Sequence, residues 1–308
     1  HTAFIPVLLA EKYYWIEAYR DIKTLLTIHN IQFQGIYDPV ILDSLFRIGT
    51  ETYTEAGVAF YDRVNWLKGG LNFADAVNTV SPTYAKEIQT PAFGEHLDGV
   101  LRANQHKLSG ILNGIDTQLY NPAIDPALAV NYTVKDLKPK RQDKHALQRR
   151  LGLPVKNVPV FSVVSRLTRQ KGMDLLLSAL DPFLKRQDVQ LVVLGTGEPA
   201  LEAAFQTYQA AYPSKVVAAI QFDTQLAQQI YAGSDLFLMP SAFEPCGLSQ
   251  MMAMHYGTLP IVHAVGGLRD TVIPYNQFTG QGTGFSFDDY RPEVLRKIMT
   301  LAVTLYRH

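Results

Sequence analysis

The sequence predicts an α/β protein built on parallel β-sheet. In residues 158–306, short apolar runs alternate with segments of helical periodicity, and glycine or charged residues follow the runs. Strands and helices that alternate at these intervals imply a parallel sheet covered by helices on both faces. The chain has 308 residues and is 47% hydrophobic, which is enough for two domains with a sizeable core.

Composition and charge exclude several classes of protein. Lys+Arg and Asp+Glu both number 28, so the basic excess typical of nucleic-acid and membrane-surface proteins is missing. No apolar run has the length of a membrane span. The single cysteine cannot form an internal disulfide, which favours a reducing, cytoplasmic location. The chain begins His1-Thr2-Ala3, without a start Met or a signal-peptide pattern.

The first part of the chain predicts a mixture of strands, short helices and loops. Residues 23–28 form a β-rich run that ends at His29, and Ser81-Pro82 is a cap for a helix over 83–88. Residues 140–150 predict a basic helix, and a solvent-exposed charged face is the favoured interpretation. Further strands are expected at 77–80 and 108–112, with a helix near 97–102. An irregular region places the domain boundary between residues 118 and 119, dividing the chain into 1–118 and 119–308.

The second part is more regular. Strands are predicted at 158–164, 190–194, 216–222, 236–239 and 259–262, and helices at 173–184, 200–211, 225–231 and 293–306. Right-handed crossovers bring the carboxyl ends of such strands to one edge of the sheet, where open α/β sheets bind ligands. The residues that attract attention lie at this edge: Arg166, Lys171, Gly195, Gly197, Glu244 and Gly266.

Two loops at this edge suit a phosphorylated ligand. Arg166 and Lys171 lie five residues apart in a strand-to-helix turn and can clamp a diphosphate, although a solvated charged loop is equally compatible. Gly172 would let the chain approach a ligand closely. Gly195-Thr196-Gly197 follows a strand, and a tight turn is its simpler explanation. The segment lacks the third glycine of a dinucleotide-binding fingerprint, so a dinucleotide site is not favoured. A mononucleotide-binding site is not excluded.

The loop after the strand at 236–239 carries one acid, Glu244, between Phe243 and Pro245. A carboxylate in this rigid setting can order sugar hydroxyls or stabilise positive charge, and a helix that begins after Gly247 favours an anion. Cys246 has no His or Asn in a recognisable partner motif, so a buried structural cysteine is favoured over a nucleophile. His29 is either a buried core histidine or a ligand contact. The histidines show no metal-binding spacing.

Taken together, these motifs resemble those of bacterial glycogen synthases and the related plant starch synthases. They occur in the family's order and cover nearly the whole chain. The matching stretches are 27–35 (TIHNIQFQG), 67–70 (LKGG), 80–84 (VSPTY), 112–116 (LNGID), 164–172 (VSRLTRQKG), 194–199 (LGTGEP), 240–248 (PSAFEPCGL) and 256–260 (YGTLP).

The resemblance implies a GT-B glycosyltransferase, with two Rossmann-like domains and retaining transfer of glucose from ADP-glucose to the non-reducing end of an α-1,4-glucan. It implies no metal and no cofactor besides the donor substrate. The residues that it assigns to catalysis are Arg166 and Lys171 on the diphosphate, Glu244 on the donor glucose and His29 from the first domain. The residues that it assigns to donor binding are Asn113, Gly195, Gly197, Phe222 (where the family tends to have tyrosine), Cys246, Gly247 and Leu248.

The chain also departs from the family pattern. The family's opening Lys-x-Gly-Gly loop, an aspartate before this region and a closing helix are absent, and Lys68-Gly69-Gly70 is a different motif. The first domain is therefore expected to be incomplete, and this span to have little or no synthase activity. A fragment that only binds nucleotide or glucan, and another GT-B enzyme that uses UDP-glucose, are the alternatives. The sequence does not fix the donor base, the acceptor length or the oligomeric state.

Overall fold

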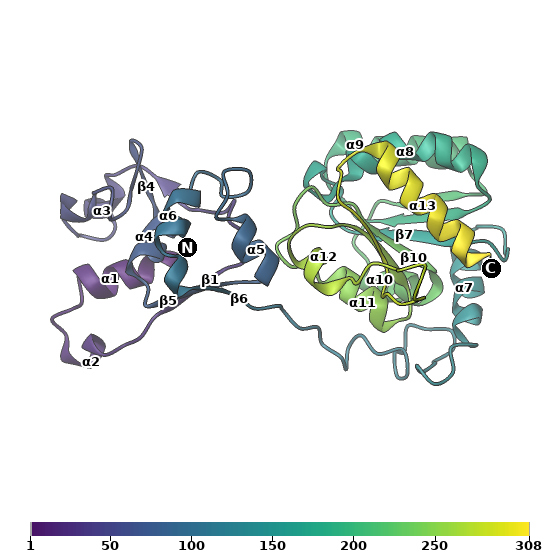
Figure 1. Ribbon diagram of the computed structural model, residues 1–308, viewed down its shortest axis with the longest axis horizontal. Helices are drawn as coiled ribbons and strands as arrows, with labels where there is room; N and C mark the ends of the chain where they lie inside the picture. Colours follow the sequence, from purple (N-terminus) through teal and green to yellow (C-terminus); the bar gives the residue numbers. More distant parts are fainter. Residues whose placement is uncertain (1, 308) are drawn as a thin grey trace. The chain divides into compact units, whose positions relative to one another are not determined.

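The structure, a computed structural model, describes residues 2–307 and consists of two compact units, His1–Leu112 and Asn113–His308 (Figure 1). The division that the sequence places at residue 118 falls close to this point and stays a prediction. Each unit contains its own parallel sheet and its own hydrophobic core.

The first unit has a parallel sheet in the order β1-β5-β6 and a small antiparallel sheet in the order β2-β4-β3. Its strands are β1 (Leu25–Ile28), β2 (Ile36–Tyr37), β3 (Ala59–Phe60), β4 (Arg63–Asn65), β5 (Ala76–Thr79) and β6 (Leu108–Gly110). Its helices are α1 (Ile5–Glu11), α2 (Glu17–Arg20), α3 (Ile41–Ser44), α4 (Trp66–Phe73), α5 (Pro82–Glu87) and α6 (Asp98–Ala103), with 3-10 turns at Thr2–Phe4, Thr50–Thr52 and Gln105–Lys107.

Two helix starts in the first unit follow directly from the sequence. The Ser81 side chain accepts a hydrogen bond from the Tyr84 amide and Pro82 occupies the first turn of α5, as predicted. Asn65 caps α4 in the same way, through the Lys68 amide. The sequence does not predict α4, because two glycines in its middle lower helix propensity. A Cβ on Gly69 would lie 2.9 Å from side-chain atoms of Val58 and Val7, so the packing of α4 on its neighbours requires glycine there.

The second unit is built on a six-stranded sheet in the order β12-β11-β10-β7-β8-β9, and every pairing in it is parallel. Its strands are β7 (Val160–Val164), β8 (Gln190–Leu194), β9 (Val216–Ala219), β10 (Leu236–Met239), β11 (Leu259–His263) and β12 (Phe285–Phe287). Its helices are α7 (Lys140–Arg150), α8 (Met173–Arg186), α9 (Pro199–Ala211), α10 (Thr224–Gly233), α11 (Ser249–His255), α12 (Gly266–Thr271) and α13 (Pro292–Tyr306), with a 3-10 turn at Arg169–Lys171.

Successive residues of the central strands point into two different core layers. On β10, Leu236 and Leu238 pack with α8 and α13, whereas Phe237 and Met239 pack with α10, α11 and α12. Figure 1 shows α8 and α9 on one side of this sheet and α10 to α12 on the other. Because both faces are covered, the strands are continuously apolar, which is why the sequence located β8 and β10 at their observed bounds.

Two sequence-based expectations about this unit are wrong. The strand expected over 216–222 ends at Ala219, so Phe222 lies in a loop. The basic helix α7 is also not a fully solvated face. Lys144 is buried and pairs with Asp235 at 2.6 Å, and Lys140 donates to the Ala232 carbonyl at 2.6 Å, at the end of α10. Lys140 thus joins α7 to α10, and Lys144 joins it to the residue directly before β10, through partners 92 and 91 residues away along the chain.

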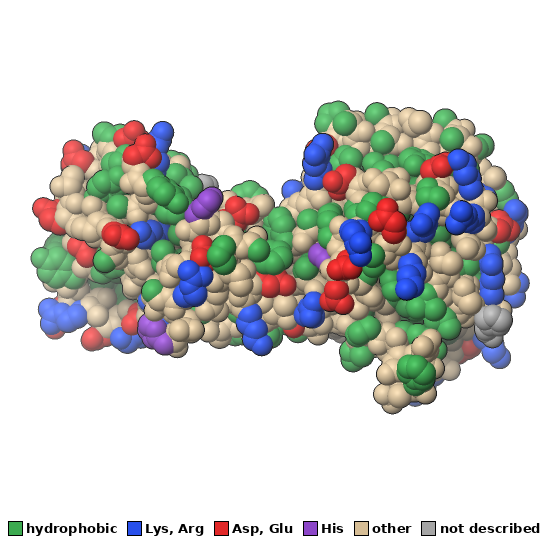
Figure 2. Space-filling model, turned by 45° about the horizontal axis from the view of Figure 1, so that its top comes forward, with side chains coloured by type: hydrophobic (Ala, Val, Ile, Leu, Met, Phe, Trp, Pro, Cys, Tyr) green, Lys and Arg blue, Asp and Glu red, His purple; other side chains and the backbone are tan. Residues whose placement is uncertain are grey.

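The surface of the protein carries charges of both signs. Figure 2 shows Lys and Arg side chains interspersed with Asp and Glu on the face in view, in keeping with the equal counts of the two kinds. Among the helices of the described residues, none is both long enough and apolar enough to cross a membrane.

Candidate active site

Several of the residues selected from the sequence lie where the strand order of the second unit reverses. From β7 the chain proceeds to β8 and β9 on one side, whereas β10 lies on the other side of β7 and continues to β11 and β12. The loops after β7 and β10 therefore flank a topological switch point at the carboxyl edge, where doubly wound sheets bind ligands. The first of these loops carries Arg166 and Lys171, and the second carries Glu244.

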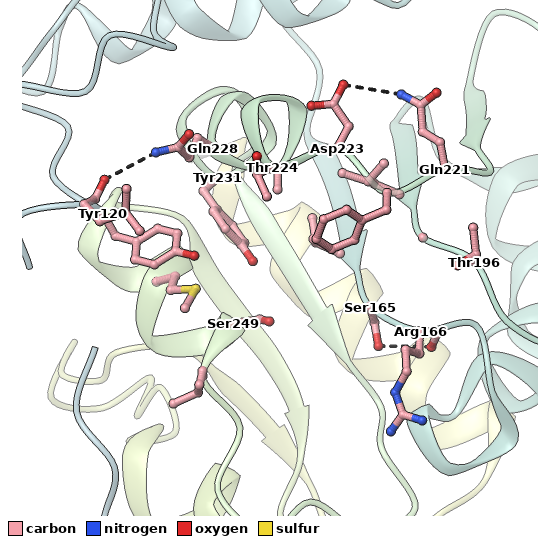
Figure 3. Close-up of a pocket in the computed structure, with 18 residues that line it drawn as sticks. Tyr120, Ser165, Arg166, Thr196, Gln221, Asp223, Thr224, Gln228, Tyr231 and Ser249 are labelled. Carbon is pink, nitrogen blue, oxygen red and sulfur yellow. Dashed lines mark hydrogen bonds between the residues drawn. The ribbon is translucent and has the colours of Figure 1, made fainter. Parts of the chain in front are cut away.

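A pocket of about 540 Å³ opens at this edge (Figure 3). Four of the predicted site residues line it: Arg166, Gly195, Phe222 and Leu248. The Phe222 ring is 90% exposed, so one of its faces is free to stack on a planar ligand. Arg166 lies at one end of the pocket and Tyr120 at the other (Figure 3). Lys171, Gly197, Glu244, Cys246 and Gly247 are not among the lining residues.

The pocket also contains polar groups that sequence inspection missed. Tyr231 on α10 is buried, and its hydroxyl interacts with the Ser249 side chain on α11. Burial raises the pKa of Tyr231 to about 12, so this phenol keeps its proton at neutral pH. The Gln228 amide donates to the Leu119 carbonyl at 3.3 Å and ties the segment before α7 to the pocket. Tyr231 and Gln228 look like ordinary helix residues in sequence, so only the fold assigns them to the site.

Beside the pocket, the structure pairs Lys171 with Glu244. The lysine Nζ lies 2.5 Å from Oε2 of the carboxylate, and the two side chains are 18% and 6% exposed. The Ser241 hydroxyl donates to the same oxygen at 3.0 Å. A cation and an anion thus meet at the switch point, where one can face a phosphate and the other a sugar hydroxyl.

Main-chain contacts hold the two loops together. The Ala242 amide donates to the Gln170 carbonyl at 2.9 Å, directly between the lysine and the glutamate loops. Gly172 has φ +72°, and a Cβ there would lie 1.8 Å from the Pro240 carbonyl oxygen. Glycine at this position therefore permits close approach to the neighbouring loop, and its close approach to a ligand stays a prediction. On the other side, the Gly267 amide donates to the Glu244 carbonyl at 3.1 Å.

The Gly195-Thr196-Gly197 segment forms a tight connection with the loop after β7. A Cβ on Gly195 would lie 1.8 Å from the Ser165 carbonyl oxygen, and one on Gly197 2.1 Å from the Leu167 carbonyl oxygen. The Leu167 amide donates to the Thr196 carbonyl at 2.9 Å. These glycines therefore have a clear packing function, and their assignment to donor binding stays a prediction.

Cys246 is buried, and burial raises the pKa of its thiol, while a hydrogen bond from the Asn113 main chain acts in the opposite direction. Gly247 has φ +70°, and its carbonyl accepts a hydrogen bond at 3.0 Å from the side-chain Nε2 of Gln250, in the first turn of α11. Leu248 lies directly before that helix and is 40% exposed. Asn113 thus lies near the Glu244 loop through its backbone.

The Cys246 environment predicts an unreactive thiol. In the native protein we expect reaction with a disulfide reagent at neutral pH to be at least about tenfold slower than in the urea-unfolded chain, because the reactive species is the thiolate. The chain has one cysteine, so the absorbance of the released thiol reports this residue alone. Equal rates in the two states would show that the thiol is accessible and ionised.

His29 belongs to the first unit, directly after β1, and its side chain is exposed. The interpretation of His29 as a buried core histidine is therefore wrong, and its assignment to catalysis stays a prediction. Lys68 in the same unit is buried in α4 and donates to the Ala59 carbonyl at 2.6 Å. Within the described chain there is no group of three or more His, Cys, Asp or Glu side chains that could hold a metal ion.

Comparison with known proteins defines the class. The family model for the starch synthase catalytic domain matches residues 1–103, and that for group 1 glycosyl transferases matches residues 145–306. The catalytic domain of starch synthase IV from Arabidopsis thaliana, solved with ADP and acarbose, superimposes with a TM-score of 0.91 at 35% identity over 99% of this chain and 64% of that chain. The fold is therefore GT-B.

The chain belongs to the group 1 glycosyltransferases and is of the glycogen and starch synthase type. It is 86% identical over 307 residues to the glycogen synthase of Lactiplantibacillus plantarum, and 57% identical over 309 aligned positions to that of Streptococcus gordonii. All of this chain is covered in both comparisons, and it spans 64% and 65% of the lengths of these two relatives.

Proposed function

We propose that this protein acts as a glycogen synthase, transferring glucose from ADP-glucose to the non-reducing end of an α-1,4-glucan with retention of configuration. The observation that carries the proposal is the pocket at the switch point, together with the Lys171–Glu244 pair in the loops at the same sheet edge. The similar starch synthase IV was solved with ADP and acarbose, which supports an adenine nucleotide and a glucan as ligands here.

The geometry of the second unit suggests roles for most of the proposed residues. Phe222 offers an exposed aromatic face to the nucleotide base, as aromatic side chains do for nucleobases. Arg166 at the pocket and Lys171 beside it would bind the diphosphate and stabilise its negative charge as the glucosyl bond breaks. Glu244 would accept hydrogen bonds from the donor glucose. The main-chain groups of Cys246, Gly247 and Leu248 are proposed to border the sugar, and His29 and Asn113 complete the proposed set.

The direct test combines calorimetry with an assay of glucosyl transfer. We expect the purified chain to bind ADP more tightly than UDP, and to bind a maltooligosaccharide. Transfer of radiolabelled glucose from ADP-glucose to glycogen distinguishes catalysis from binding alone. The low activity expected for this span on sequence grounds stays a prediction that the same assay tests. Preference for UDP and UDP-glucose would instead favour the alternative GT-B enzyme.

Phe222→Ala tests the pocket itself. Loss of base stacking is expected to weaken ADP binding about tenfold, from the usual contribution of an aromatic ring stacked on a base. Phe278→Ala is the matched control, because Phe278 is 89% exposed and does not line the pocket. ADP titrations of both variants should therefore differ, and equal affinities for ADP would remove Phe222 from the proposed site.

A further inference from the structure

The Glu244 carboxylate is held by two donors on the same oxygen. Lys171 Nζ and Ser241 Oγ lie 2.5 Å and 3.0 Å from Oε2, and within the described residues Oε1 has no hydrogen bond. Ser241 is 1% exposed, so its hydroxyl is shielded from competing water. This arrangement leaves Oε1 as the acceptor available to a ligand.

Ser241 is itself fixed through its main chain by His263, at the end of β11. One ring nitrogen, Nδ1, lies 2.8 Å from the Ser241 carbonyl oxygen, and the other, Nε2, lies 3.1 Å from the Asp288 carbonyl oxygen. Carbonyl oxygens only accept hydrogen bonds, so the ring nitrogen that carries the proton donates to the carbonyl that it faces. The ring is buried and stacks on Phe287 at 5.3 Å between centroids, so it cannot turn away freely.

We propose that Ser241 is a positioning residue that holds Glu244 Oε2 toward Lys171 and thereby directs Oε1 at the hexose of a nucleoside-diphosphate sugar. The inference rests on the proposed function and adds to it the residue that orients the carboxylate. The terminal torsion of a glutamate side chain is broad and is set by its partners rather than by a strong rotamer preference. Without the hydroxyl, the carboxylate is free to turn and engage Lys171 through both oxygens, which removes the free acceptor.

Ser241→Ala tests this orientation through the difference between two ligands. ADP lacks the hexose, so the ratio of the dissociation constants for ADP and ADP-glucose measures the sugar contact. We expect Ser241→Ala to reduce that ratio about tenfold, as for the loss of one charged hydrogen bond, because any change at Lys171 affects both dissociation constants alike and cancels in the ratio. Ser241→Thr keeps the hydroxyl and should restore most of the ratio.

Ser162→Ala is the matched structural control. Ser162 on β7 is likewise fully buried and its hydroxyl donates to the Leu236 carbonyl at 3.4 Å, but it does not contact Glu244. A second measurement needs no ligand. The carboxyl carbon resonance of Glu244, assigned by comparison with a Glu244→Gln variant, should shift in Ser241→Ala and stay in place in Ser162→Ala.

The outcomes separate this inference from the proposed function. The positioning role would be overturned if Ser241→Ala kept the wild-type ratio of the dissociation constants for ADP and ADP-glucose and left the Glu244 carboxyl resonance unshifted. If the wild-type chain bound neither ADP nor ADP-glucose, the proposed function would be wrong, and the carboxyl resonance would still decide whether Ser241 orients Glu244. A shifted resonance together with a reduced ratio supports both.

Discussion

Glu244→Gln is expected to lower glucosyl transfer between about 100-fold and 1,000-fold, the range found when one group that stabilises a transition state is removed. The substitution keeps the shape of the side chain but replaces the carboxylate that lies 2.5 Å from Lys171. A Gln whose carbonyl takes the place of Oε2 presents its NH₂ group where Oε1 was. A donor then faces the sugar where an acceptor is needed, so binding of ADP-glucose is expected to weaken as well.

The effect on ADP separates this explanation from general damage. Lys171 loses its anionic partner in Glu244→Gln and becomes more available to phosphate, so the affinity for ADP should not fall. Glu202→Gln is the control, since the Glu202 carboxylate accepts from the Gly197 amide at 2.7 Å near the same sheet edge but does not contact Lys171. Calorimetry decides the question even where turnover is below detection. An unchanged affinity for ADP-glucose and unchanged transfer would remove Glu244 from the site.

The sequence predicted those parts of the second unit that depend on the local pattern of apolar residues and on the rules of parallel sheets. Strands covered on both faces must be continuously apolar, and this property located β8 and β10. The carboxyl ends of parallel strands meet at one edge, so Arg166, Gly195 and Phe222, which follow three different strands, line the same pocket. Topology alone was enough to bring Arg166 and Gly195 to this edge, whereas Phe222 was selected through the family resemblance.

Features that depend on contacts between residues far apart in the chain could not be predicted from the sequence. Lys144 belongs to a strongly basic helix, and only its pairing with Asp235, 91 residues away, explains its burial. Ser241 likewise resembles an ordinary loop serine until the fold places it against both Glu244 and His263. The strands β2 and β3 have two residues each, too few to show the alternation by which strands are recognised.

Gly172→Ala is expected to destabilise the second unit by about 3 kcal/mol or more. Two costs combine at this position. The left-handed conformation, with φ +72°, costs an alanine about 1–2 kcal/mol relative to its preferred conformations. In addition, the new Cβ would lie 1.8 Å from the Pro240 carbonyl oxygen, which is main chain and cannot move without displacing β10 and the Glu244 loop.

Gly152→Ala isolates the first of these costs. Gly152 has φ +70° and no atom within 4 Å of the position that a Cβ would occupy, so the alanine there meets conformational strain without a clash. We expect it to cost only about 1 kcal/mol. The difference between the two variants in urea unfolding then measures the close approach between the loops that carry Lys171 and Glu244.

The two units give the experiment an internal reference. The chain has two tryptophans, Trp15 and Trp66, and both lie in the first unit. Tryptophan fluorescence therefore follows the first unit, whereas circular dichroism is dominated by the larger second unit, and we expect the circular dichroism transition of Gly172→Ala to move to lower urea. Because the strain separates the two loops, binding of ADP-glucose should be lost together with stability. Equal destabilisation by Gly172→Ala and Gly152→Ala would show that the Pro240 contact relaxes and that the loops are not held together at this glycine.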